Sequence, residues 1–268
     1  MGTFILNQSN YHSPEARREF MSASRYKDYC GSLGLVPCEA RAVAMDRGEW
    51  HEDPSEAMRV SSFVDAHFSG TLATFKSQNP DIMTQKGELK AGYKHAETII
   101  KRIESSEYMM KCLSGQKQVI MTAEFFGCKW SCMLDSHSPG IVNVDLKVMA
   151  QINKAHYVKD YGRMSFIEYY GYREQAAIYS KIVEINTGKR LPFLFACASK
   201  EEIPDIQVIG VTDQDINEAI NQIERNMPRV LGLRSGELKP DSCGTCSYCR
   251  SVKIVEKPIH YSELILSI

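Results

Sequence analysis

The sequence predicts an α/β (α+β) fold in which helices flank a central mixed β-sheet. Two observations lead to this prediction: helical patterns precede a run of strands over residues 118–148, and a helix–strand–strand–helix pattern follows it. Such an order is typical of one sheet covered by helices. We expect a single domain over 1–268, with a helical lead-in over 1–56, a core over about 57–235 and a cysteine-rich tail over 236–268.

Composition excludes several classes of protein. The content of 43% hydrophobic and 24% charged residues is ordinary for a globular chain. A formal net charge of −1 argues against binding nucleic acid by overall charge, although a local basic groove can still do so. No apolar run approaches the roughly 20 residues of a membrane span, and the N-terminus lacks the layout of a signal peptide. We therefore expect a cytoplasmic protein with no membrane partner.

Helical spacing of apolar residues precedes the strands. In one of these segments His67 falls within the apolar stripe and Asp65 lies beside it. Helices are expected to begin near Arg25 and near Met58, and two further helices are expected over residues 39–46 and 94–110.

Three consecutive strands are expected next, over residues 118–126, 128–134 and 141–148. Side chains alternate between the two faces of a strand, so Asp145 and Lys147 share one face and Leu146 lies on the opposite, apolar face. Asp135 is expected at the end of the preceding strand, across the turn. Two carboxylates and an ammonium at one sheet edge suit Mg²⁺ or Mn²⁺ with a phosphate substrate. The alternative is a solvated edge strand with a surface ion pair.

After the strands, Ser165 can cap a long helix over residues 166–186, in which Gln175 and Tyr179 share one face. On their own these two residues could equally be core packing with an incidental polar neighbour. Two more strands, over 191–198 and 206–211, and a helix over 213–227 complete the pattern.

Three cysteines at two-residue spacing lie in the tail: Cys243, Cys246 and Cys249. In a reducing compartment this spacing favours metal thiolates over disulfides, and a tetrahedral site needs a fourth ligand. Zinc, an iron–sulfur cluster and three free thiols all remain open from the spacing.

The order of these motifs resembles the PD-(D/E)XK nuclease superfamily. A strand with an acid, a strand with D-x-K and a helix with Q-x-x-x-Y carry the resemblance over residues 124–179. More narrowly, the chain is similar to RecB-type nuclease domains, lambda exonuclease and the RecE (exonuclease VIII) nuclease domain, through the stretches NYHS, MSASRYKDY and SSFVDAHFSG. Ser61 stands where relatives have glycine, and Leu134 where they have proline.

The resemblance implies a role for each of these positions. Asp135 and Asp145 would hold the catalytic Mg²⁺ (or Mn²⁺), with the Leu146 carbonyl as an added ligand and Asp65 as a further one. Lys147 would act on the attacking water. The remaining implied roles are another acid near the site for Glu124, DNA contacts for Gln175 and Tyr179, and His67 as the alternative to Asp65.

For the cysteines, the resemblance implies a [4Fe–4S] cluster. Some RecB-like nucleases bind such a cluster through one upstream cysteine and three near the C-terminus. Cys38 matches the upstream position, with Cys30 as second choice.

The implied function is a metal-dependent exonuclease that resects double-stranded DNA ends, 5′ to 3′, for phage-type homologous recombination. A homo-oligomer and a single-strand annealing protein as partner are implied as well. The alternatives are a catalytically inactive DNA-binding or assembly protein with a nuclease fold, and a PD-(D/E)XK endonuclease.

Overall fold

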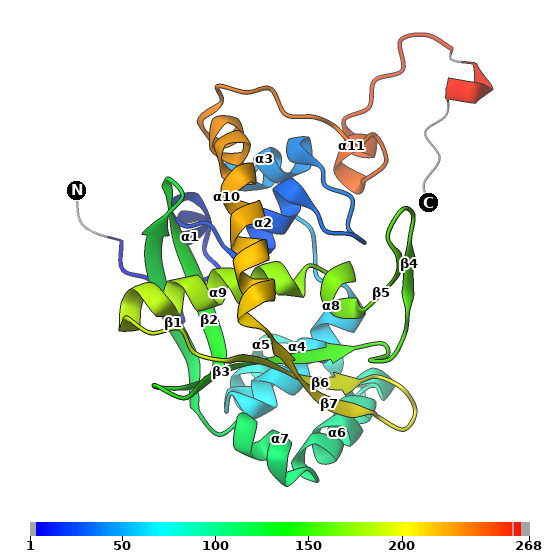
Figure 1. The fold of residues 1–268 in the computed structure, drawn as a ribbon. Helices are drawn as coiled ribbons and strands as arrows, with labels where there is room; N and C mark the ends of the chain where they lie inside the picture. The colour runs from blue at the N-terminus through cyan, green and yellow to red at the C-terminus, as the bar shows by residue number, and fades with distance from the viewer. Residues whose placement is uncertain (1–3, 259, 264–268) are drawn as a thin grey trace.

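A five-stranded mixed sheet organises the molecule (Figure 1), and the computed structural model describes residues 4–258 and 260–263. The strand order is β1-β2-β3-β6-β7, with β3 and β6 parallel and all other neighbours antiparallel. The strands are β1 Gln116–Phe125, β2 Cys128–Ser138, β3 Val142–Met149, β6 Phe193–Ser199 and β7 Ile206–Val211, and a separate hairpin joins β4 His156–Val158 to β5 Gly162–Met164. This arrangement confirms the predicted central mixed sheet flanked by helices.

Helices cover both faces of the sheet. The α-helices are α1 Pro14–Glu19, α2 Ala23–Cys30, α3 Glu39–Arg47, α4 Glu56–Phe68, α5 Leu72–Gln78, α6 Ala91–Glu104, α7 Glu107–Cys112, α8 Phe166–Tyr169, α9 Tyr172–Thr187, α10 Asp213–Ser235 and α11 Ser247–Ser251, with short 3₁₀ turns at Pro80–Ile82 and Tyr261–Glu263. Helices α2, α3, α9 and α10 share one hydrophobic cluster with the sheet, and α4, α6 and α7 share the other. None of the helices in the described residues has the length and apolar character of a bilayer span.

Strand β3 lies at the middle of the sheet, and its two faces differ in chemistry. Val144 and Leu146 pack into the cluster beneath α4 and α6. Asp145, only 3% exposed, points to the opposite face, which α9 covers. Since β3 has neighbours on both sides, the alternative of a solvated edge strand is wrong.

Three expected helices differ from the structure. The segment predicted as one helix over 94–110 is divided at Ser105 and Ser106 into α6 and α7. The segment predicted as one helix over 166–186 is divided into α8 and α9, because Gly171 takes the left-handed conformation (φ 65°) and starts a new helix axis. The expected end at Met227 is also wrong, since α10 continues through Pro228 to Ser235. Val230 and Leu233 are buried beyond the proline, and their packing keeps this part of the chain helical.

Candidate active site

A cleft of about 490 Å³ opens between the N-terminal segment, strands β2 and β3, and helix α9. The predicted residues Asp135, Asp145, Lys147, Gln175 and Tyr179 all line it. They come from three elements separated in sequence, so the sheet and its crossover helix bring them together.

The gap between β2 and β3 places the first acid. These strands pair only over residues 136–138 and 142–144 and then diverge. In the gap, Asp135 Oδ2 accepts a hydrogen bond of 2.8 Å from the Leu146 amide. A strand residue directs its N–H and C=O to the same side, so the Leu146 carbonyl faces this gap too. Asp135 was predicted at the end of a strand. In the structure it lies within β2, because β2 continues to Ser138.

A buried network holds Asp145 and Lys147. Lys147 Nζ lies 2.6 Å from Asp145 Oδ2, and the Gln175 amide donates to Asp145 Oδ1 at 2.7 Å. The carbonyl end of Gln175 accepts from Lys147 Nζ at 3.1 Å. The same ammonium lies 4.6 Å from the ring centroid of Tyr172. Both ends of Gln175 are thus engaged inside the protein, so this residue positions the acid and the lysine.

The carboxylates of the cluster repel one another, which affects their pKa values. Desolvation, then Asp145 and Asp65, raises the pKa of Asp135 well above its usual range. Burial, then the charge of Asp145, raises the pKa of Asp65 to about 6. Burial lowers the pKa of Lys147, but the combined effects of Asp145, Tyr172 and Asp135 outweigh it, and the net pKa is raised. Lys147 is therefore an ammonium at neutral pH, suited to orienting a water or balancing phosphate charge.

Two other residues predicted for the site, Glu124 and His67, do not join the acids. Glu124 is exposed and pairs in register with Lys129, six residues or about 20 Å along β2 from Asp135. The expectation that Glu124 lies near the other acids is therefore wrong. His67 turns toward α6, where its Nε2 lies 2.8 Å from Glu104 Oε1, so α4 presents Asp65 to the cluster instead.

The structure adds residues that sequence reasoning did not assign to the site. Tyr11, His12, Arg17 and His51 line the cleft from the N-terminal segment. Lys117, near the start of β1, interacts electrostatically with Asp135 and Asp65. Tyr11 and His12 belong to the stretch NYHS that carried the resemblance, so the motif was a signal for them, whereas Arg17, His51 and Lys117 belong to no motif in the chain.

The donor atoms fit a hard divalent cation. Asp65, Asp135 and Asp145 offer carboxylate oxygens, and Leu146 offers a carbonyl oxygen. Asp145 Oδ2 is buried and, among the described residues, accepts no hydrogen bond of good geometry beyond its ion pair with Lys147. An all-oxygen set with clustered negative charge is the type that Mg²⁺ and Mn²⁺ prefer.

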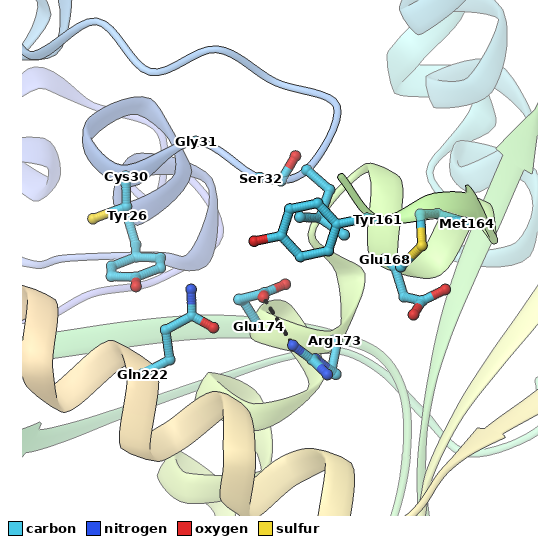
Figure 2. A pocket seen from close by; sticks show the side chains of 11 residues that line it. Tyr26, Cys30, Gly31, Ser32, Tyr161, Met164, Glu168, Arg173, Glu174 and Gln222 are labelled. Atoms are coloured by element: carbon cyan, nitrogen blue, oxygen red, sulfur yellow. Dashed lines mark ion pairs between the residues drawn. The ribbon is translucent and has the colours of Figure 1, made fainter. Parts of the chain in front are cut away.

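A second group of donors lies away from the cleft. The sulfurs of Cys38, Cys243, Cys246 and Cys249 all lie within 4.8 Å of one another. Cys30, the other upstream candidate, lines a separate pocket of about 360 Å³ beside Tyr26, Arg173 and Glu174 (Figure 2). The structure therefore brings Cys38, and not Cys30, to the three tail cysteines.

Comparison with known proteins agrees with this geometry. Residues 22–252 match the model of a family described as a PDDEXK-like domain of unknown function (DUF3799). The chain belongs to this PDDEXK-like family. A crystal structure of a candidate exonuclease from Eubacterium rectale is similar, with 49% sequence identity, 99% of this chain and 100% of that chain covered, and a TM-score of 0.96. No curated protein matches the chain.

Membership in the PDDEXK-like family supports the predicted superfamily and a nuclease fold, and nucleases of this superfamily generally use divalent metals. Leu134 stands where the motif has proline, and it is fully buried opposite Val119 of β1. Ser61 replaces the glycine of the helical motif, and its hydroxyl donates to the Val148 carbonyl at 3.1 Å. Both departures therefore have structural roles that leave the acids in place.

Proposed function

We propose that this protein is a metal-dependent exonuclease that resects double-stranded DNA ends. Asp135, Asp145 and Lys147 line one cleft, and Asp65 lies close enough to interact electrostatically with Asp145 and Asp135; this arrangement is the observation that supports the proposal. A bound Mg²⁺ or Mn²⁺ would supply Lewis acidity and lower the pKa of a water. Lys147 balances the charge of the phosphodiester, and Gln175 keeps the ammonium beside Asp145.

The finer parts of the proposal come from the resemblance to RecE-like exonucleases. They are 5′-to-3′ resection, a role in phage-type homologous recombination, a homo-oligomer, a single-strand annealing partner and a cytoplasmic location. The similarity to a candidate exonuclease over the whole chain favours end resection over the other activities of nuclease folds.

Two surfaces have the chemistry to contact DNA. His12, Arg17 and His51 border the cleft and suit phosphates. The β4–β5 hairpin projects from the body of the molecule (Figure 1) and exposes Tyr157, 79% accessible, directly opposite Arg163. An exposed aromatic ring beside a guanidinium is suited to stacking on bases of a separated strand.

The direct test compares the wild type with Asp145→Asn on end-labelled duplex DNA in Mg²⁺. The substitution keeps the volume of the side chain but removes the charge that a metal needs, so we expect cleavage to fall about a thousandfold or more. Glu124→Gln is the matched control, because it removes one negative charge from the same sheet, far from the cleft. Equal cleavage by wild type and Asp145→Asn would refute the active-site assignment.

Further substrates separate the finer alternatives. Duplexes labelled at the 5′ or the 3′ end report polarity, and a covalently closed plasmid reports endonuclease activity, since it has no end. Calorimetric titration with Mn²⁺ addresses the inactive alternative. A protein that binds DNA but takes up no Mn²⁺ in the cleft would be an assembly protein rather than an enzyme.

A further inference from the structure

The four clustered cysteines come from opposite ends of the chain. Cys38 occupies the N-cap position of α3, and its thiol makes no capping hydrogen bond. Cys243 and Cys249 flank Cys246, which is the N-cap of α11. All nine cysteines are free thiols, so no disulfide joins these segments. A shared metal ion or metal cluster is a way for four thiols to join these segments.

The distances between the sulfurs identify the size of the group that they can hold. Cys38 Sγ lies 3.5 Å from Cys249 Sγ and 3.7 Å from Cys246 Sγ, and Cys243 Sγ lies 3.8 Å from Cys249 Sγ. With Zn–S bonds of about 2.3 Å, the corners of a regular tetrahedron stand about 3.8 Å apart. The observed spacing therefore fits four thiolates around one ion.

An iron–sulfur cube does not fit the same spacing. In a [4Fe–4S] cluster each cysteine binds a different iron and extends outward from a separate corner. Opposite sulfurs are then separated by the core of the cluster and two further bonds, well beyond the 4.8 Å that encloses all four here. The cluster implied by the resemblance thus disagrees with the geometry of this chain.

Hydrogen-bond donors around the sulfurs support thiolates. The Cys246 amide donates to Cys243 Sγ at 3.3 Å, and the Cys249 amide donates to Cys246 Sγ at 3.4 Å. Gly244, in the left-handed conformation (φ 73°), makes the tight turn that directs the first of these amides inward. Amides directed at sulfur stabilise the negative charge that a thiolate ligand carries.

We propose that these four cysteines bind one tetrahedral Zn²⁺ ion, which fastens the C-terminal tail to α3 and to the loop over residues 48–55. Beside the cysteines, Ser247 Oγ donates to Glu52 Oε1 at 3.0 Å, and the rings of Tyr248 and Trp50 meet edge to face at 5.6 Å. The same loop carries His51 to the border of the cleft. The ion thus supports one wall of the cleft from outside it.

Metal analysis of the full chain tests the proposal without any assay of cleavage. Protein purified in parallel with and without oxygen should contain one zinc per chain, with no iron, no acid-labile sulfide and no brown colour. Exchange with Co²⁺ should give the intense visible absorption of a tetrahedral thiolate site. Iron and sulfide in the anaerobic sample would overturn the proposal in favour of a cluster, and a metal-free sample would overturn it in favour of free thiols.

Variants identify the ligands. Cys38→Ser should lose the zinc and lower the melting temperature by roughly 5–10 °C. Cys30→Ser, in the neighbouring pocket, is the matched control and should keep the zinc. If Cys38→Ser does not fold, chelator-stripped wild type replaces it: four additional thiols should react with a thiol reagent, and proteases should cut the segment over 236–252 faster. Full zinc in Cys38→Ser, or no newly reactive thiols after stripping, would contradict the assignment.

Discussion

The acid cluster in the cleft and the cysteine cluster beside α3 are built in opposite ways. Asp135, Asp145 and Lys147 lie on two strands of the central sheet, so the core places them before any ion binds. The cysteines lie at helix N-caps and in the segment after α10, where surface contacts such as those of Asp241 with Glu39 and of Ser247 with Glu52 hold the tail. One set offers oxygen donors on a rigid support, and the other offers sulfur donors on a weak one.

The two sites accordingly need their ions for different purposes. The acid cluster keeps three repelling carboxylates in a preformed site, which suits a cation that exchanges with solvent during turnover. The cysteine cluster gains its order from the metal, as structural zinc sites do. The acid cluster needs its ion for cleavage of DNA, and the cysteine cluster needs its ion to hold the C-terminal tail against α3.

Chelation gives the largest contrast between the two sites. Brief treatment with EDTA should abolish DNA cleavage, and added Mg²⁺ should restore it, because oxygen ligands release a hard cation readily. The zinc content should be unchanged over the same treatment, since thiolates bind far more tightly. Cleavage and zinc are measured on the same samples. If zinc were lost together with cleavage, and cleavage recovered only after zinc was added, the two sites would not differ in this way.

Gln175→Ala should reduce cleavage by about a hundredfold without affecting zinc. The substitution removes the amide that holds Asp145 Oδ1 at 2.7 Å and Lys147 Nζ at 3.1 Å, and leaves both charges buried without it. Single-turnover rates at saturating DNA measure the effect. Gln151→Ala, which affects an exposed contact with Glu201, serves as control. A change confined to DNA affinity would instead favour the predicted direct contact of Gln175 with DNA.

Asp65 of the acid cluster should make stability depend on pH between pH 4 and 6. Burial and then Asp145 raise the pKa of Asp65 from 3.8 to about 6, so the folded protein holds this proton more tightly than the unfolded chain. The resulting stability is fully present below the unfolded pKa and is lost as pH rises through the folded one. Without divalent metal, the melting temperature should therefore fall across this range.

Magnesium should oppose that loss, because it binds the deprotonated carboxylates. Thermal unfolding in EDTA and in Mg²⁺, each at several pH values, measures both effects. Asp65→Asn should flatten the metal-free profile. An unchanged profile in that variant would show that Asp65 does not face the other acids.

The smallest effect is expected where the two regions meet. Trp50→Ala removes the ring contact with Tyr248 but leaves every donor atom of both sites. We expect DNA affinity to fall about two- to threefold through a looser His51 loop, with the single-turnover rate at saturation unchanged. Binding and rate are measured separately, with the exposed Tyr108→Ala as control. An effect on rate as large as that of Gln175→Ala would mean that the sites are not separate.

Local patterns predicted much of the candidate site. The two-residue period of a strand put Asp145 and Lys147 on one face, and the helical period put Gln175 and Tyr179 on another. Both pairs line the cleft. Such relations depend on backbone geometry over a few residues, which tertiary packing does not change.

Other expectations depended on packing between distant segments and could not be settled in the same way. Nothing in the strand pattern shows that Glu124 lies at the far end of β1 from the acids, or that β2 and β3 diverge at Asp135. The resemblance predicts that Gln175 contacts DNA, but in the structure its amide binds Asp145 at one end and Lys147 at the other.

Residue order alone shows which donor atoms this protein has and which of them share a strand face, including the acids and lysine of β2 and β3 and three cysteines at metal-binding spacing. Which of these atoms meet depends on the tertiary structure. Asp65 rather than His67 lies beside the other acids, because of the face of α4 that packs on the sheet. Cys38 rather than Cys30 meets the tail cysteines, because the tail runs beside α3. Periodicity is a property of a short backbone segment, whereas convergence depends on how whole elements pack around a common core.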